Sequence, residues 1–328
     1  MSTLTHTPAG TTGSRRSPLR MRGLAWLMFR QHRVMFLMVA AFTVLGAIWL
    51  VYQRAASLDA VRGAGWPGRS ADKVDSGVVL AIHSKLEKTV PILSALPVVL
   101  GVFCGAPLIA SDQEQGTAQL ATTQSVPRKR WLSYKLGTGL VLVLLPTIVL
   151  GSLFTWWWRA VRVFGERDWM QGTVFDNTGP MLAALTLFTA VGGIAIGLIA
   201  RRVLAAMVGT FLFAVVTQVA WSFVRPELAT PRRISYPIGA EFPAKLSDAV
   251  QVDNWVSTAS GELFGYGTCV QEEKYEACLA DKGIVNATVE YFGYDQMPVM
   301  QWTGAGILGG LSVLLIAFIV VRVGRRPL

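Results

Sequence analysis

The chain has 328 residues, of which 52% are hydrophobic and only 15% are charged, and its formal net charge is +10. Soluble globular proteins carry about 25% charged residues, so the composition excludes an ordinary soluble domain and indicates a membrane protein. The basic balance does not indicate a nucleic-acid partner, because no run of Lys and Arg is interleaved with aromatic residues that could stack on bases.

Six windows of about 20 apolar residues follow along the chain, and none contains Asp, Glu, Lys, Arg or His. A helix of this length crosses the hydrocarbon core of a bilayer, which is roughly 30 Å thick. We therefore predict an all-α polytopic membrane protein with six transmembrane helices. These are expected at Val34–Tyr52, Pro91–Ser111, Leu136–Trp157, Met181–Ala200, Val203–Phe223 and Trp302–Val321.

The charges between these windows predict the orientation. Segments 1–33, 112–135, 201–202 and 322–328 fall on one side, with 15 basic residues and two acids. Segments 53–90, 158–180 and 224–301 fall on the other side and carry 15 basic residues and 18 acids. Because short cytoplasmic loops are enriched in Lys and Arg, both termini are expected in the cytoplasm.

The residues before the first window divide into two parts. Residues 1–18 are rich in Ser, Thr, Gly and Pro and are expected to be a disordered cytoplasmic tail. Residues 19–33 combine apolar side chains with four arginines, which predicts a helix in the membrane interface. The alternative is a plain extension of the first transmembrane helix.

Glycines recur at four-residue spacing within three windows. The pairs are Gly101 with Gly105, Gly193 with Gly197, and Gly306 with Gly310. Such pairs allow close approach of helix backbones in lipid, so a compact bundle is expected.

The segment 224–301 is long enough for a small extracytoplasmic subdomain. It contains Cys269 and Cys278, which are expected to form a disulfide in an oxidising compartment. Metal binding is the lesser alternative, because no His lies nearby and the adjacent acids are more simply a solvated face. Segment 302–328 is expected to supply the sixth helix and a basic cytoplasmic tail.

Ionisable groups inside the membrane are kept only for function, and the predicted helices have none. Their polar groups are mainly hydroxyls and the amide of Gln218. The chain also lacks an HExxH motif and a phosphate-binding glycine loop. We therefore expect a protein that is not an enzyme, that holds no metal or cofactor, and that depends on a partner for energy.

One polar segment interrupts the apolar sequence, at residues 112–131, "DQEQGTAQLATTQSVPRKRW". A short amphipathic helix is predicted from about Asp112 to Thr123, with Asp112 and Glu114 in its first turn, where the helix dipole favours acids. Pro127 and the basic residues Arg128, Lys129 and Arg130 would end it and hold the chain against lipid headgroups. An ordinary loop is the alternative.

The block 101–137, "GVFCGAPLIASDQEQGTAQLATTQSVPRKRWLSYKLG", resembles the signature of type-2 ABC transporter permeases, especially an actinobacterial group. Similar segments are "FRQHR" (29–33), "TWWW" (155–158), "ARR" (200–202) and "RPELATP" (225–231). The resemblance implies a transmembrane subunit in the bacterial cytoplasmic membrane, paired with a second permease copy or a related permease.

The resemblance further implies that separate ABC ATPase subunits bind ATP and Mg²⁺ on the cytoplasmic face. Residues 112–124 would be the coupling helix that docks on the ATPase, and the interfacial helix 19–33 would also touch it. The docking residues would be Glu114, Gly116, Thr117, Gln119 and Leu120.

The expected activity is export of a hydrophobic or amphipathic molecule past the hydroxyl-lined inner faces of the bundle. Candidate path residues are Thr43, Thr210, Phe213 and Gln218, with packing between helices as the alternative for each. The alternative function is a non-transporting sensor or assembly subunit that acts through segment 224–301.

Overall fold

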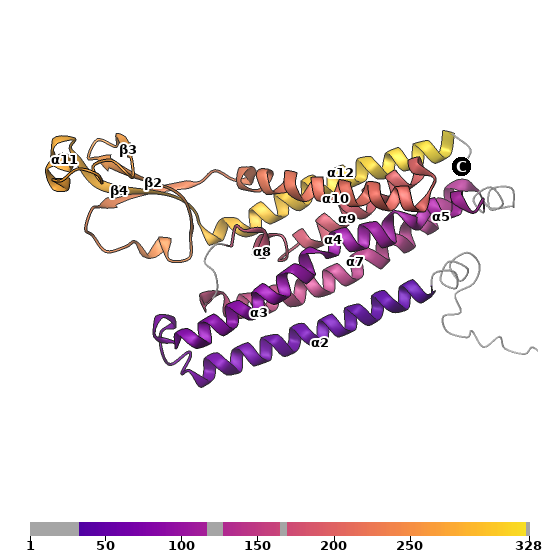
Figure 1. Ribbon diagram of the computed structural model, residues 1–328, viewed down its shortest axis with the longest axis horizontal. Coiled ribbons are helices and arrows are strands. Elements are labelled where there is room, and N and C mark those ends of the chain that lie inside the picture. The colour runs from indigo at the N-terminus through magenta and orange to yellow at the C-terminus, as the bar shows by residue number, and fades with distance from the viewer. Residues whose placement is uncertain (1–32, 117–126, 165–168, 326–328) are drawn as a thin grey trace, which may run out of the picture.

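The computed structural model describes residues 33–116, 127–164 and 169–325. Figure 1 shows an elongated molecule, in which long helices lie side by side and a small β-sheet projects from one end. We call this end the sheet end. The opposite end is the terminal end, where the described chain begins at Arg33 and finishes at Arg325.

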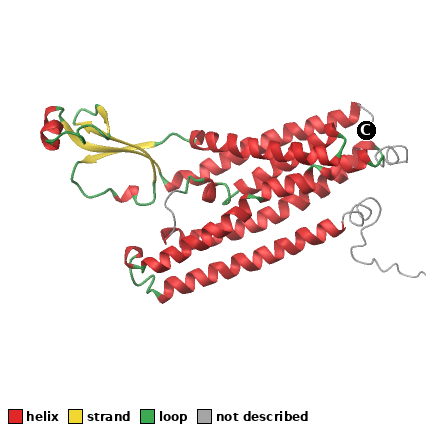
Figure 2. Ribbon diagram, in the orientation of Figure 1, coloured by secondary structure: helices red, strands yellow, loops and turns green. Residues whose placement is uncertain are grey.

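Six helical segments of the described chain are long and apolar enough to cross a membrane, as predicted. Helix dominates the fold outside the projecting sheet (Figure 2), which confirms the all-α polytopic membrane architecture. Five of the six segments consist mainly of one helix each: α2 (Arg33–Gly63), α7 (Arg128–Val161), α9 (Met181–Ala200), α10 (Val203–Val224) and α12 (Met297–Arg325).

The second segment, Ser76–Glu114, is broken by its prolines and glycines. Its parts are α3 (Ser76–Ser94), α4 (Leu96–Leu100), a π-helical turn η2 (Gly101–Gly105) and α5 (Pro107–Glu114). Proline lacks the N–H that would bond to the preceding turn, and its ring clashes there, so Pro97 and Pro107 each sit where a new helix begins. The segment therefore bends as it passes through the bundle.

Helix α9 is the central element of the bundle. Its apolar window is 72% buried, against 6% for α2, and it packs against α7, α10, α12 and the broken segment. The contact with the broken segment depends on glycine, because a Cβ on Gly193 would lie 2.9 Å from the Gly101 carbonyl oxygen. A Cβ on Gly105 would lie 2.6 Å from the carbonyl oxygen of Ala190. The predicted close packing of these two glycine pairs is confirmed.

The third glycine pair behaves differently. An added Cβ at Gly306 or Gly310 of α12 would meet open space, so the prediction that this pair packs within the bundle is wrong for the described chain. The spacing alone does not show which face of α12 is turned to a neighbour.

The fully buried residues of α2 all lie in its sheet-end half, whereas Met35, Phe36 and Val39 of the other half pack against the bundle as half-buried side chains. The fully buried residues are Leu50, Gln53, Ser57 and Val61. In the sheet-end half, the Trp157 Nε1–H donates to Ser57 Oγ at 3.2 Å, and the Arg54 guanidinium lies 3.6 Å from the ring centre of Trp156. These contacts explain why α2 continues to Gly63, past the predicted end at Tyr52. Its other half diverges from the second segment (Figure 1).

The segment after α10 folds into an antiparallel sheet of order β1-β4-β2-β3, a structure that the sequence analysis did not assign. Val289 and Tyr291 of β4 pack with Leu246 and Ala249 on one face. The predicted disulfide between Cys269 and Cys278 is present, with 5.8 Å between the Cα atoms. The strands are β1 (Arg232–Pro237), β2 (Val250–Thr258), β3 (Leu263–Gly265) and β4 (Ile284–Phe292), with helix α11 (Tyr275–Asp281) beside them.

Short helical turns connect the longer elements. They are η1 (Ala71–Lys73), η3 (Arg162–Phe164), α8 (Gly172–Phe175), η4 (Arg225–Leu228), η5 (Ala244–Leu246) and η6 (Tyr294–Gln296). The predicted tail 1–18 and all of the predicted interfacial helix 19–33 except Arg33 lie outside the described residues.

Candidate functional sites

A buried ion pair joins the second and third membrane segments at the terminal end. The Lys135 ammonium contacts the Asp112 carboxylate and also donates to the Leu108 carbonyl oxygen at 2.8 Å. Lys135 is 1% exposed and Asp112 6%. The ammonium lies 5.1 Å from the ring centre of the buried Trp131. The pair therefore holds the end of α5 against the first turns of α7, which are connected by residues 113–134.

This geometry corrects the predicted start of the coupling helix. Asp112 and Glu114 lie in the last turn of α5, which ends at Glu114, so neither residue opens a new helix. Gly116 follows with φ of +68°, the left-handed conformation that commonly ends a helix and that glycine adopts without strain. Asp112 is turned inward to Lys135, and its position is set by that pairing.

Glu114 connects the polar segment to a third membrane helix. Its carboxylate accepts a hydrogen bond of 2.7 Å from the backbone N–H of Val203, the first residue of α10. An acid at this position satisfies an N–H that has no partner within the helix and interacts favourably with the helix dipole. The contact is exposed. Asp112 and Glu114 thus connect the terminal ends of α5, α7 and α10, and both lie at the start of the polar segment.

The other predicted docking and anchoring residues are only partly described. Thr117, Gln119 and Leu120 lie outside the described residues. Arg128, Lys129 and Arg130 form the first turn of α7, where Arg130 is exposed. Cations are disfavoured at a helix N-terminus. The helix dipole therefore does not account for this basic cluster.

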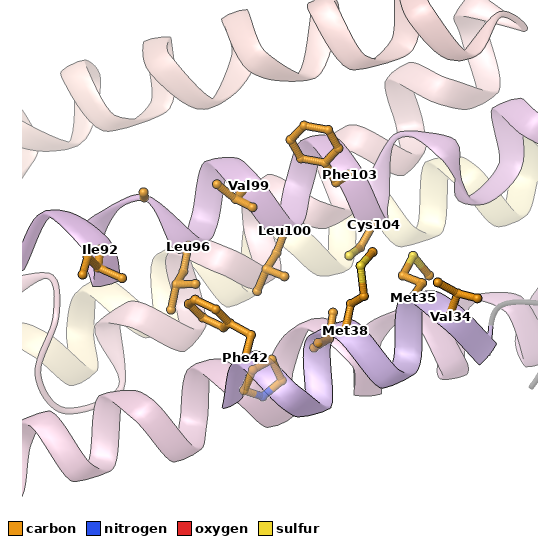
Figure 3. A pocket seen from close by; sticks show the side chains of 13 residues that line it. Val34, Met35, Met38, Phe42, Ile92, Leu96, Val99, Leu100, Phe103 and Cys104 are labelled. Carbon is orange, nitrogen blue, oxygen red and sulfur yellow. The ribbon is translucent and has the colours of Figure 1, made fainter. Parts of the chain in front are cut away.

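An apolar groove of about 730 Å³ opens where α2 diverges from the second segment. Figure 3 shows Met38 and Phe42 of α2 pointing toward Leu96 and Leu100 of the second segment. Pro146 of α7 also lines the groove, and none of the described residues that line it is charged. Ligand pockets for small molecules span roughly 300–1,000 Å³ and are mostly apolar, so the groove has a suitable size and lining.

The four predicted path residues do not come together around this groove. Thr210 is buried, bonds to the Ala206 carbonyl, and packs its methyl group against Gly193 of α9. Phe213 lies over Gly192, with its ring centre 5.2 Å from that of Phe188. These two residues pack α10 on α9.

The remaining two path residues lie apart from each other. The Thr43 hydroxyl donates to the Val39 carbonyl at 2.7 Å within α2, and Thr43 does not line the groove. Gln218 lines a separate polar pocket and donates to the Ser94 carbonyl at 3.4 Å. Among the described residues, no three His, Cys, Asp or Glu side chains are placed to hold a metal ion.

Comparison with known families decides the membership of this chain. The model of the ABC-2 membrane transporter related family matches residues 40–225, which is more than half of the chain. The chain belongs to this family. Comparison with curated proteins gives no match, and comparison with solved structures gives none either.

The match to the ABC-2 membrane transporter related family includes most of the features described above. It covers both ion-pair partners, Glu114 with Val203, and the groove wall from Ile92 to Cys104, whereas the groove residues within 34–39 of α2 precede it. It ends where α10 gives way to η4, so the sheet and α12 lie beyond it. Membership of this family indicates a multi-pass membrane protein that serves as the permease component of an ABC transporter.

Sequence reasoning missed several of the residues that define these sites. It gave no role to Lys135, although a lysine one residue before a long apolar window is a signal for a partner acid. It also gave no role to Asp176, Asn177 or Arg225, which meet only through the fold.

Proposed function

We propose that this chain exports a hydrophobic or amphipathic molecule, driven by separate ABC ATPase subunits that bind ATP and Mg²⁺. The observation that carries the proposal is the connection of α5, α7 and α10 at the terminal end. A force applied to the polar segment between Asp112 and Lys135 reaches two helices through the ion pair and a third through Glu114. A coupling element needs this kind of connection.

The docking surface is proposed to lie on residues 112–124. Glu114, Gly116, Thr117, Gln119 and Leu120 remain the candidates for contact, with Glu114 also holding α10. The basic residues at 128–130 are proposed to bind anionic headgroups. This accounts for three cations at a helix N-terminus, where the dipole opposes them.

The groove between α2 and the second segment is proposed to admit the substrate from the adjoining leaflet. Its apolar lining suits a hydrocarbon portion and offers nothing to an ion. The proposed location is the bacterial cytoplasmic membrane, with both termini in the cytoplasm. The proposed assembly contains a second permease, either a copy or a relative, as in the actinobacterial group that the sequence resembles.

Co-expression with a candidate ABC ATPase subunit, followed by co-purification in detergent, tests the proposal. Wild type is compared with Thr117→Arg, which adds bulk and charge to the proposed docking surface. The matched control is Ser133→Arg, which adds the same side chain at an exposed position of α7. Loss of the ATPase in Thr117→Arg alone supports docking through residues 112–124.

Two other outcomes contradict the proposal. If all three forms retain the ATPase equally, residues 112–124 do not form the docking surface. If wild type itself fails to bind the ATPase, the alternative of a non-transporting subunit is favoured. That alternative has one structural argument of its own, the folded sheet beyond the family match.

A further inference from the structure

A second cavity, of about 210 Å³, lies in the helical bundle toward the sheet end. Its walls come from six separate parts of the fold. They include Ser94 of α3, Pro97 of α4, Asp176 after α8, Gln218 of α10 and Arg225 after α10. The apolar groove lies against other residues of the same second segment, so the two cavities are distinct.

The two charged side chains of this pocket neutralise each other. Arg225 Nη2 lies 2.7 Å from Asp176 Oδ2, and the Trp221 Nε1–H donates to Asp176 Oδ1 at 2.9 Å. Arg225 Nη1 donates to the Met170 carbonyl at 3.0 Å. Burial raises the pKa of the Asp176 carboxyl, although Arg225 and Trp221 act in the opposite direction. The described walls therefore offer no unpaired charge that would select an ion.

Two residues that line the pocket have a buried polar atom without a partner among the described residues. Asn177 is fully buried and uses its Nδ2 for bonds to Ser94 Oγ at 2.8 Å and to the carbonyls of Gly172 and Thr173. Within the described part of the chain, its Oδ1 accepts no hydrogen bond and Arg225 Nε donates none. Buried polar atoms are normally paired, because an unmet acceptor loses its bonds to water without compensation. A ligand with O–H or N–H groups can bond to the exposed amide of Gln218 directly, and it reaches Asn177 Oδ1 only after a small shift of that buried side chain.

We propose that this pocket binds a neutral group rich in hydroxyl or amide functions. The size agrees, because 210 Å³ corresponds to about seven waters of liquid at roughly 30 Å³ each, enough for a compact head group. Leu182 and Leu185 supply apolar contact on one side. The group could be the head of an amphiphile or a free polyol in the medium at the sheet end, and the two sources share this chemistry.

Binding to the purified full chain in lipid nanodiscs, without ATPase, tests the proposal. Three radiolabelled amphiphiles with the same octyl chain are compared: octyl glucoside, octyl sulfate and octyl trimethylammonium. Methyl glucoside serves as the free head group. The variants are Gln218→Leu, which removes an exposed donor, and Asn177→Leu, which removes the buried acceptor. The control is Ser222→Ala, an exposed hydroxyl on α10 that does not line the pocket.

Saturable binding of octyl glucoside, weakened about 3- to 10-fold in each Leu variant and unchanged in Ser222→Ala, is expected. If methyl glucoside binds as octyl glucoside does, with the same loss in the Leu variants, a free polyol is sufficient as ligand. If octyl glucoside binds and methyl glucoside does not, the ligand is the head group of an amphiphile. Equal binding of all three octyl compounds, or no effect of either Leu variant, overturns the proposal. Gln218→Leu decides the matter if Asn177→Leu fails to fold. Because no ATPase is present, failure here is distinct from failure of the transport proposal.

Discussion

Lys135 and Asp112 carry charges at a depth where neither is exposed to water, so each depends on the other. Removal of one member of a buried pair leaves an uncompensated charge, which is far more costly than removal of both. The apolar surroundings of Trp131 and Leu132 make this site sensitive to such a change. The pair thus holds α5 against α7 at the terminal end, together with the apolar contacts around it.

Single and double substitutions should distinguish the removal of one charge of the Lys135–Asp112 pair from the removal of both. We expect Lys135→Met or Asp112→Leu alone to destabilise the chain by about 3–5 kcal/mol, and the double variant to recover most of this loss. Thermal unfolding of the purified chain in one detergent measures the effect. If the double variant is as unstable as the sum of the single ones, the two charges are not coupled.

Glu114 should stabilise the start of α10. We expect Glu114→Ala to speed hydrogen exchange of the Val203 amide about fivefold, because loss of a capping contact costs about 1 kcal/mol. Glu114→Gln keeps an oxygen acceptor and should show a smaller change. Exchange mass spectrometry of peptides that span 198–210, and so retain the Val203 amide, provides the measurement, with the interior of α9 as reference. Identical exchange in all three forms would show that the carboxylate does not hold α10.

At the scale of elements, α2 has two halves with different surroundings. Ser57 and Arg54 attach one half to α7, while Met38 and Phe42 in the other half face the groove. A helix that is fully buried along one half and only partly buried along the other can leave space for a ligand beside the second half. The groove therefore lies where the packing of α2 becomes looser.

Filling the groove should block the function proposed for it. We expect Met38→Trp to reduce substrate-stimulated ATPase activity of the assembled complex at least fivefold, while unfolding temperature stays unchanged. Leu37→Trp is the matched control, since Met38 and Leu37 are both 64% exposed and Leu37 does not line the groove. Equal activity of the two variants would exclude the groove from the substrate path.

The elements also show how far the sequence predicts this fold. The window Met181–Ala200 coincides with α9, because an all-apolar helix needs no neighbour to define it. The end of α2 was underestimated, because Gln53 and Ser57 are polar yet buried against Trp157. Asp112 was placed in a first turn, because an acid after an apolar window looks like a helix start until its partner Lys135 is known.

The candidate sites were less predictable than the helices, for a physical reason. Hydropathy reports the preference of each residue for lipid, whereas the polar pocket depends on Ser94, Asp176 and Arg225 meeting across three elements. The strand β4, "IVNATVEYF", is rich in β-branched and aromatic residues and could have been predicted. The pairing of β4 between β1 and β2 is a long-range contact that one sequence does not specify.

At the scale of the whole molecule, the sheet and the basic helix ends lie at opposite ends of one bundle (Figure 1). The Cys269–Cys278 disulfide ties α11 to the loop after β3 at the sheet end, and disulfides persist in oxidising compartments. The basic residues Arg322 and Arg325 end α12 at the other extremity, and short cytoplasmic loops are enriched in Lys and Arg. Both features therefore support the proposed orientation, with the terminal end in the cytoplasm and the sheet end outside.

Cysteine labelling in intact cells should reveal this orientation. The native chain provides a low background, because Cys269 and Cys278 are bonded to each other and Cys104 is buried. We expect Ala259→Cys, in the exposed turn between β2 and β3, to react with a membrane-impermeant maleimide. Gly324→Cys, at an exposed position near the end of α12, should react only after the membrane is opened. The reverse pattern would put the disulfide in a reducing compartment and the basic ends outside, and it would also place the proposed docking segment where no ATPase could reach it.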